Sequence, residues 1–299
     1  MMQLLFTGAS GFLGQNIKPM LEEHYQITTI GLADSDDIKA NLALESPSFT
    51  KPFDVVLHAA GKAHFVPKTE AECQAFYDVN YGGTVNLCKA LEAVGCPKAF
   101  IFISTVAVYG LEAGEDISED APLSGTSPYA KSKIMAERYL TDWCAERGVT
   151  LSIIRPSLIA GPNPPGNLGA MIKGIATGRY LSIGAGAARK SVLMVQDIAT
   201  LVPLLAERGG VFNVCDDSQP TFRELERTIS SQLGKRLPLS IPMWFARCLA
   251  FVGNMMGRRA PINSDKLAKI TQSLTFSNRR IKDALNWQPT DVISNFKIR

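Results

Sequence analysis

The stretch TGASGFLG, residues 7–14, decides the fold of this chain. It follows the apolar run QLLF (3–6), which we expect to be a strand, and it opens a stretch with helical spacing of apolar residues. Gly8 allows a tight turn, Gly11 lets backbone N–H groups approach a pyrophosphate, and Gly14 lets the helix pack closely against the strand. A pyrophosphate at this turn would lie at the positive end of the helix. The stretch therefore predicts a dinucleotide-binding turn between a first strand and a first helix.

Apolar runs and helical stretches alternate over the first half of the chain. We expect strands at 3–6, 26–30, 54–60, 99–104 and 150–155. The spacing of apolar residues predicts long helices over 70–94 and 127–147, between the last three of these strands. Continuously apolar strands separated by helices indicate a parallel sheet that is covered on both faces. The sequence therefore predicts an α/β fold with a doubly wound parallel sheet, the Rossmann fold.

The character of the sequence changes after the fifth strand. A Pro/Gly-rich loop, PNPPGNLG (162–169), is followed by shorter elements. We therefore expect residues 1–160 to form an NAD(P)-binding Rossmann domain that carries the catalytic residues. Residues 161–299 are expected to form a smaller substrate-binding lobe, with some of that chain returning to the sheet.

Composition limits the partners and the compartment of the protein. The net charge is +3 and the basic residues are scattered, which argues against nucleic-acid binding. The six cysteines form no CxxC pair, so we interpret them as free thiols in a reducing compartment and expect a cytoplasmic protein. The three histidines (24, 58 and 64) do not pair with a cysteine cluster, so no metal site is expected.

Targeting and membrane segments are also not expected. The N-terminal sequence MMQLLFTGAS lacks the basic segment and long apolar core of a signal peptide. No apolar run has the length of a membrane span. The nearest case, IPMWFARCLAFVGNMMG (241–257), is interrupted by Arg247, Gly253 and Asn254. This favours a core or lid helix over a helix that touches a membrane.

The end of the second strand bears on the choice of dinucleotide. In ITTIGLADSDD (27–37), Gly31 occupies the position at which an acid would bind the adenine ribose, and Asp34 lies slightly beyond it. No Arg or Lys occurs between residues 27 and 38 to bind a 2′-phosphate. We therefore predict NAD, with Asp34 at the ribose, and NADP is the alternative.

Two further stretches, STVAVYG (104–110) and YAKSK (129–133), predict a catalytic site. Tyr129 and Lys133 are four residues apart, so they share one face of a helix. A nearby ammonium lowers the pKa of a tyrosine from its usual value of about 10. Such a tyrosine can remove a proton from a sugar hydroxyl or return one to a ketone. Thr105, just past the fourth strand, would hydrogen-bond the same oxygen at the edge of the sheet where ligands lie.

Together these motifs resemble those of extended short-chain dehydrogenases/reductases of the NAD-dependent epimerase/dehydratase family, which act on nucleotide sugars. The resemblance covers most of the chain and implies a homodimer formed through the helices at 70–94 and 127–147. The matching stretches are TGASGFLG, DVVLHAAGKAH (54–64), VNYGGTVNL (79–87), FISTVAVYG (102–110), SPYAKSKIMAE (127–137), IIRPSLIAGP (153–162), GNLGAMIKGIATGRYLSIG (166–184) and RKSVLMVQDIA (189–199).

The resemblance implies two sets of contacts. The cofactor contacts are Gly8, Ser10, Gly11, Phe12, Leu13, Gly14, Asp34, Asn41, Leu42, His58, Ala59, Ala60, Lys62, Asn80, Ser104, Tyr129, Lys133 and Pro156. The substrate contacts are Lys62, Thr105, Val106, Ala107, Tyr129, Ser157, Asn167, Leu168, Leu181, Ile183 and Lys190.

Some members of these sets have specific expected places. Asn41 and Leu42 stand where an Asp-Leu pair usually meets the adenine. Asn167 and Leu168 would lie near the substrate diphosphate, and Leu181 and Ile183 would flank its base. Asp197 would be structural. Lys190 stands where the family often has an arginine that clamps the diphosphate, and Lys266 is a candidate for a second clamp.

The resemblance implies a 4-epimerase of UDP-hexoses or UDP-N-acetylhexosamines, a step in polysaccharide biosynthesis. Dehydration is less favoured because Val106 and Ala107 follow Thr105 where the family's dehydratases have an Asp-Glu pair. An NAD(P)H-dependent 4-keto-sugar reductase shares every residue named above and is the alternative enzyme. A non-catalytic, dinucleotide-sensing protein is a further alternative, although it would not need both Tyr129 and Lys133.

Overall fold

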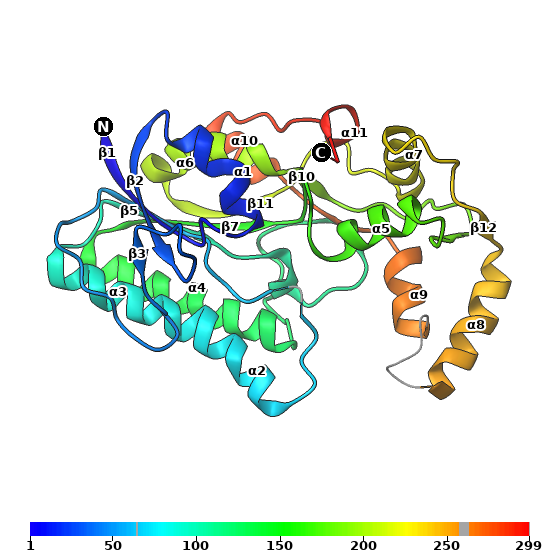
Figure 1. Ribbon diagram of the computed structural model, residues 1–299, viewed down its shortest axis with the longest axis horizontal. Helices are drawn as coiled ribbons and strands as arrows, with labels where there is room; N and C mark the ends of the chain where they lie inside the picture. The colour runs from blue at the N-terminus through cyan, green and yellow to red at the C-terminus, as the bar shows by residue number, and fades with distance from the viewer. Residues whose placement is uncertain (64, 257–262, 299) are drawn as a thin grey trace.

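A seven-stranded sheet forms the centre of the protein in this computed structural model, which describes residues 1–63, 65–256 and 263–298 (Figure 1). All neighbouring strands are parallel, in the order β11-β7-β5-β4-β1-β2-β3. The strands are β1 (Met2–Thr7), β2 (Tyr25–Gly31), β3 (Ile38–Lys39), β4 (Val55–His58), β5 (Ala99–Ile103), β7 (Thr150–Pro156) and β11 (Gly210–Val214). The predicted doubly wound parallel sheet is therefore confirmed.

Alternate residues of the strands face two separate apolar cores. Leu4 and Phe6 pack in the core with α1 (Phe12–Leu21) and α6 (Val195–Arg208), whereas Leu5 packs in the core with α3 (Gly83–Val94) and α4 (Pro128–Arg147). Figure 1 shows α1 and α6 over one face of the sheet and α3 and α4 under the other. Burial on both faces explains why these strands read as continuous apolar runs.

The segment 70–94, expected as a single helix, contains three parts. It forms α2 (Glu70–Tyr77), the π-helical turn η1 (Asp78–Gly82) and α3. Two adjacent glycines, which have low helix propensity, stand at the junction between η1 and α3. Single π-helical turns often occur at functional sites, and this one turns the side chain of Asn80 inward, where it is fully buried.

The edge strand β11 comes from the chain beyond residue 160, where the sequence predicts a domain boundary. It pairs with β7, and the preceding helix α6 packs against α1. The division of the chain into two domains at residue 160 stays a prediction. The remaining helices and turns are η2 (Val106–Tyr109), α5 (Gly166–Ala176), α7 (Phe222–Gln232), α8 (Met243–Met256), α9 (Ser264–Thr271), α10 (Arg279–Leu285) and α11 (Val292–Asn295).

Three small parallel ribbons organise the second half of the chain. They pair β10 (Val192–Met194) with β8 (Leu158–Ala160), β12 (Ser240–Ile241) with β9 (Ser182–Ile183), and β13 (Leu274–Phe276) with β6 (Gly114–Ile117). Helices α8 and α9 project from the end of this half (Figure 1). In the described parts of the chain, each helix is too short or too polar to cross a bilayer.

The sequence favours a core or lid helix at 241–257, and of these two the core alternative is wrong for most of the large side chains. The small residues Ala246 and Ala250 are the ones buried against Ile183 and Leu267, while most of the large apolar side chains of α8 are exposed. Apolar composition predicted the helix, but it did not predict which face lies inward.

Candidate active site

The glycine turn between β1 and α1 has the geometry that a dinucleotide requires. Gly8 has a φ of +79°, and a Cβ there would lie 2.7 Å from the backbone nitrogen of Ala60. A Cβ on Gly14 would overlap the backbone of Ala9, so α1 packs closely on the turn. Gly11 is the N-cap of α1, and its lack of a side chain leaves the first turn open to an anion. The residues present therefore fit a pyrophosphate.

The first turn of α1 contributes Phe12 and Leu13, which are expected as cofactor contacts. Both are partly buried and pack against the core between the sheet and helices α1 and α6. Ser10 precedes the helix, and its carbonyl accepts a hydrogen bond from the Gln15 side chain at 2.9 Å. This leaves the backbone N–H groups at the start of the helix, rather than these side chains, as the groups suited to bind phosphate.

Buried His58 lies in a continuous chain of hydrogen bonds behind the glycine turn. The Thr7 hydroxyl accepts from the Ala60 N–H at 3.0 Å and donates to His58 Nδ1 at 2.7 Å. His58 Nε2–H donates to the Thr84 hydroxyl at 2.9 Å, which donates to the Asn80 carbonyl at 2.7 Å. Because each hydroxyl has a single proton, this order assigns a neutral ring protonated at Nε2. His58, expected as a cofactor contact, thus positions the loop that carries Ala59 and Ala60.

We expect His58 to stay neutral in the folded protein until the pH approaches 3. Burial, with a smaller contribution from the Lys133 charge, lowers its pKa from 6.5 to about 3. Between these two values the unfolded chain binds a proton that the folded protein does not, so the free energy of unfolding falls as the pH falls. The slope from this residue is about 1.4 kcal/mol per pH unit. Imidazole ¹⁵N shifts recorded from pH 7 to pH 4 measure the protonation state of His58. A doubly protonated His58 at pH 5 would contradict the assignment.

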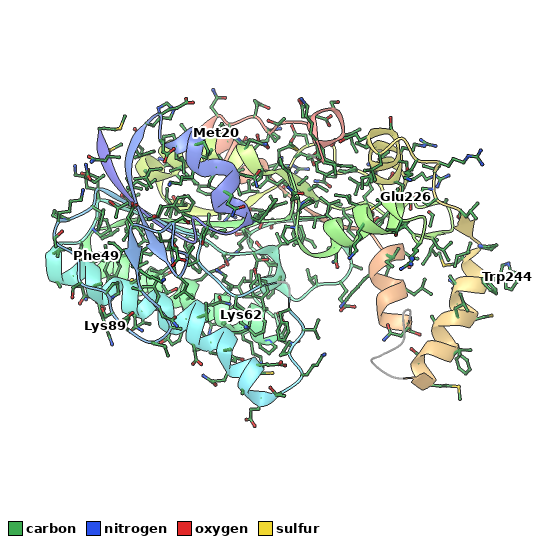
Figure 2. The ribbon with its side chains drawn as sticks, in the orientation of Figure 1. Met20, Phe49, Lys62, Lys89, Glu226 and Trp244 are labelled. Carbon is green, nitrogen blue, oxygen red and sulfur yellow. The ribbon has the colours of Figure 1, made fainter. Side chains whose placement is uncertain are left out.

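Asn80 connects the loop after β4 to helix α4. Its Oδ1 accepts from the Lys62 N–H at 2.7 Å, and its Nδ2 donates to the Lys62 carbonyl at 3.2 Å and to Ser132 Oγ at 2.9 Å. Sequence reasoning placed Asn80 at the cofactor, but its amide is engaged within the chain. The Lys62 ammonium lies 5.3 Å from the ring centroid of Phe65 and 5.8 Å from that of Phe76. Figure 2 shows Lys62 near α2, on the side of the sheet that carries α4.

The structure brings Thr105, Tyr129 and Lys133 to the carboxyl end of β5. Ser127 caps α4, with its hydroxyl accepting from the backbone N–H of Ala130 at 3.1 Å, and this sets the start of the helix that carries Tyr129 and Lys133. The side chains of Tyr129 and Thr105 lie close enough together that hydrogen bonding with Thr105 lowers the Tyr129 pKa. Lys133 Nζ donates to the Ile103 carbonyl at 2.8 Å, immediately before the Ser104-Thr105 pair.

The pKa values of Tyr129 and Lys133 follow from their burial. Burial raises the pKa of Tyr129 above its usual value, and the hydrogen bond with Thr105 lowers it in part. Burial lowers the pKa of Lys133 to about 8, while the Glu137 carboxylate raises it. The expected lowering of the Tyr129 pKa by Lys133 is therefore not seen in the protein alone, because the ammonium is held at the Ile103 carbonyl and desolvation dominates. A lower value needs a positive charge from outside the chain.

A buried ion pair behind these residues was not predicted from the sequence. Arg155 donates to both carboxylate oxygens of Glu137, at 3.1 Å from Nε and 2.6 Å from Nη2. The Glu137 carboxylate also accepts from Ser104, and Arg155 Nη1 donates to the Tyr109 hydroxyl at 3.0 Å. The two charged side chains are only 6% and 4% exposed. An arginine inside the apolar run IIRP was the signal that could have indicated this pair.

Asp36, as well as the predicted Asp34, is a candidate for the ribose contact, because its carboxylate lies next to Gly31. Asp34 is 96% exposed and pairs with Lys39 at 2.5 Å. The turn after β2 folds back, so that Asp36 Oδ2 accepts from the Ala33 N–H at 3.0 Å and lies where a side chain on Gly31 would be. The Asp36 carboxylate thus takes the place of the acid that Gly31 lacks.

The adenine pair expected at 41–42 is divided between surface and core. Leu42 is 8% exposed and packs against Gly83. Asn41 accepts a hydrogen bond at Oδ1 from the Ala43 N–H at 3.1 Å and so shapes its own turn. Only Asn41 of the two is thus placed to present polar atoms to a ligand.

The ends of β5 and β7 line the other side of the expected ligand position. Pro156 ends β7, and Ser157 after it is 9% exposed, with a hydroxyl that has no hydrogen-bond partner among the described residues. Val106 and Ala107 begin η2, where the Ala107 N–H donates to the Thr105 hydroxyl at 3.2 Å. A buried hydroxyl without a partner fits a group that accepts or donates a hydrogen bond there.

The expected substrate contacts of the second lobe are partly exposed and partly buried. Asn167 is exposed in the first turn of α5, whereas Leu168 is buried beneath it. Leu181 is 53% exposed, but Ile183 is only 8% exposed and belongs to the core under α8. Burial lowers the pKa of Lys190 to about 8, and its ammonium donates to the Gln272 carbonyl at 3.1 Å.

Three further residues named in the sequence analysis are Asp197, Lys266 and His64. The Asp197 carboxylate accepts from the Thr290 hydroxyl and N–H at 2.6 and 3.0 Å, as a structural residue would. The side chain of Lys266, and His64 as a whole, lie outside the described residues.

Comparisons with known proteins agree with this geometry. The model of the NAD dependent epimerase/dehydratase family matches residues 4–215. The N-acetyl-alpha-D-glucosaminyl-diphospho-ditrans,octacis-undecaprenol 4-epimerase of Escherichia coli O157:H7 is 31% identical, over 93% of this chain and 88% of its own length. The UDP-glucose 4-epimerase of Vibrio cholerae is 28% identical, over 97% and 92%. A solved structure of RMD from Pseudomonas aeruginosa complexed with NADPH has the same fold, with a TM-score of 0.76 at 23% identity over 99% of this chain and 96% of that one.

Proposed function

The chain belongs to the NAD-dependent epimerase/dehydratase family, and from that premise we propose that it is an NAD-dependent 4-epimerase of nucleotide sugars. The substrate class is a UDP-hexose or a UDP-N-acetylhexosamine. The observation that carries the proposal is that Thr105, Tyr129 and Lys133 come together at the end of β5, at the sheet edge next to the glycine turn.

In this mechanism Tyr129 is the acid and base. Its phenolate removes the proton of the C4 hydroxyl as hydride leaves C4, and Thr105 hydrogen-bonds the same oxygen. The resulting ketone rotates, hydride returns to its other face, and Tyr129 returns the proton. The chemistry that a bound nicotinamide supplies is reversible uptake of hydride. Lys133, anchored at the Ile103 carbonyl, holds its ammonium at the end of β5, and the glycine turn with the first turn of α1 would hold the pyrophosphate.

The proposal is tested with a panel of sugars. We would incubate the protein with UDP-glucose, UDP-N-acetylglucosamine, polyprenyl-diphosphate-linked N-acetylglucosamine and a 4-keto nucleotide sugar, with and without NADPH, and read C4 configuration by NMR. The third substrate is included because the E. coli relative is named for a lipid-linked sugar. Inversion at C4 without added NADPH supports an epimerase. Turnover only of a 4-keto sugar, with one NADPH consumed per product, would instead support the reductase.

Cofactor choice should depend on Asp36. We expect Asp36→Asn to lower the preference for NAD over NADP roughly tenfold, about the value of one charge-assisted hydrogen bond. Asp34→Asn is the matched control and should leave the ratio of the two dissociation constants nearly unchanged, because Asp34 is solvent-exposed. If Asp34→Asn changed the ratio and Asp36→Asn did not, the ribose contact would be assigned to Asp34. Titration of each variant with both dinucleotides measures the ratio.

We further propose a cytoplasmic homodimer that associates through α2, α3 and α4. The six cysteines are all unpaired, which fits a reducing compartment. On the proposed dimer face, α4 exposes Met135 by 38%, and Tyr81 and Tyr139 meet edge to face with ring centroids 6.1 Å apart. Sedimentation of the wild type and of Met135→Asp tests this assembly. We expect the wild type to be dimeric and the variant to be monomeric, and a dimeric variant would contradict the proposed interface.

A further inference from the structure

Helix α8 carries its large apolar side chains on the outside of the protein. Trp244, Phe251 and Met255 are 67%, 68% and 81% exposed. Figure 2 shows Trp244 at the outer side of α8, away from the body of the protein. The inward side is formed by small residues, of which Ala246 and Ala250 are buried against α9. The α8 outer face is defined here as Trp244, Phe245, Cys248, Leu249, Phe251, Val252 and Met255, all of which are exposed.

The spacing of the α8 outer face is that of one side of an amphipathic helix. Trp244, Cys248, Phe251 and Met255 follow each other at intervals of four, three and four residues. In a surface helix of a globular protein such a stripe faces the core. Here it faces outward as a contiguous patch, and such patches mark interaction sites, in contrast to singly scattered apolar residues.

The chain segment that carries the α8 outer face has charged residues of one sign only. The sequence has no acidic residue between Glu226 and Asp265. Lys235 and Arg236 before the helix and Arg247 on it are exposed. A second copy of this face would bring like charges together without a carboxylate to neutralise them. An anionic lipid surface matches both the apolar stripe and the flanking cations.

We propose that the α8 outer face binds the surface of an anionic lipid bilayer, with the helix lying in the plane of the interface. The apolar side chains enter the boundary between headgroups and acyl chains, and the basic residues contact lipid phosphates. Helix α8 follows β12, whose partner β9 directly follows Leu181. Binding therefore holds the expected substrate segment of the second lobe close to the membrane. This inference does not depend on the proposed epimerase activity.

The intrinsic fluorescence of the full chain provides a direct test. Of the three tryptophans, Trp143 and Trp287 are only 3% and 5% exposed, so Trp244 is the one that a membrane can reach. We expect a blue shift of emission and co-flotation of the protein with vesicles of phosphatidylcholine and phosphatidylglycerol. With pure phosphatidylcholine vesicles we expect at least about tenfold weaker binding, because the attraction of the basic residues is lost.

Two double variants test whether vesicle binding depends on the α8 outer face or on any exposed apolar side chain. Trp244→Ser with Phe251→Ser should weaken binding to the anionic vesicles at least about tenfold. Leu44→Ser with Val66→Ser removes two apolar side chains that are equally exposed, at 81% and 79%, but lie elsewhere, and it should bind as the wild type does. Absence of flotation, or an equal loss in both double variants, would overturn the proposal. A blue shift that depends on protein concentration without vesicles would show that a second copy covers the face instead.

Discussion

Replacing Tyr129 with phenylalanine should lower kcat by about 10²- to 10⁴-fold, the usual contribution of a positioned acid–base group. The substitution removes a single oxygen, and with it the hydrogen bonding with Thr105 that lowers the Tyr129 pKa. The fold should survive, because losing a hydrogen bond of this kind costs about 1 kcal/mol. Turnover of the best sugar in the panel, measured under single-turnover and steady-state conditions, gives the ratio.

Tyr139→Phe is the matched control for this prediction. It removes the same atom from the same helix, ten residues farther along α4, at a position that faces Tyr81 rather than Thr105. The control should keep wild-type turnover, and both variants should bind the dinucleotide as the wild type does. If Tyr129→Phe retained full turnover of every sugar that the wild type accepts, Tyr129 would not be the acid and base.

Glu137→Gln is expected to destabilise the fold by about 3 kcal/mol or more. The substitution leaves the Arg155 guanidinium buried without a counter-charge, and removing one partner of a buried ion pair typically costs this much. It should also lower the pKa of Lys133 below its present value of about 8, because the Glu137 carboxylate is the group that raises it. Urea unfolding measures the first effect, and the alkaline limb of the kcat/KM profile reports the second.

The control for Glu137 lies on the same helix at the surface. Glu146 pairs with Arg147 at 2.9 Å but is 70% exposed, so Glu146→Gln should change the free energy of unfolding by no more than about 0.5 kcal/mol. Equal effects of the two substitutions would mean that burial does not strengthen the Glu137–Arg155 pair. A destabilised Glu137→Gln with an unchanged pH profile would restrict Glu137 to a structural role.

The fold could be predicted because each of its signals is local. The apolar strands are buried on both faces, so their sequence alone identifies them. The turn after β1 requires glycine at positions 8, 11 and 14 for steric reasons. The Tyr129–Lys133 pair was predictable for the same reason, since four-residue spacing places two side chains on one side of a helix.

What the sequence did not indicate depends on contacts between distant segments. The hydrogen-bond chain through His58 joins residues from β1, β4 and α3, and no local pattern distinguishes such a histidine from one that touches a ligand. The choice between Asp34 and Asp36 depends on how the turn after β2 folds back. Glu137 and Arg155 carry charges, which sequence reasoning assigns to the surface unless a partner is known.

For helix α8, the sequence failed in the opposite way, because exposed apolar residues were assigned to the interior rather than buried charges to the surface. Apolar residues are assigned to the core by default, and the core was one of the two places, core or lid, predicted for 241–257. The side of α8 that lies inward is the one that packs against α9, and it carries the small buried residues Ala246 and Ala250. A sequence does not state which neighbour a helix will have, so the exposed stripe could not be predicted.

The position of β11 at the edge of the sheet affects how the chain can be made. Until residues 210–214 leave the ribosome, the outer edge of β7 has no partner, and an unpaired strand edge invites pairing with other chains. During synthesis the first 160 residues therefore cannot complete their sheet, however early they emerge. A gene divided into two halves that reassemble would have to be divided after residue 214, beyond the last strand of the sheet, rather than at the change in sequence character near 160.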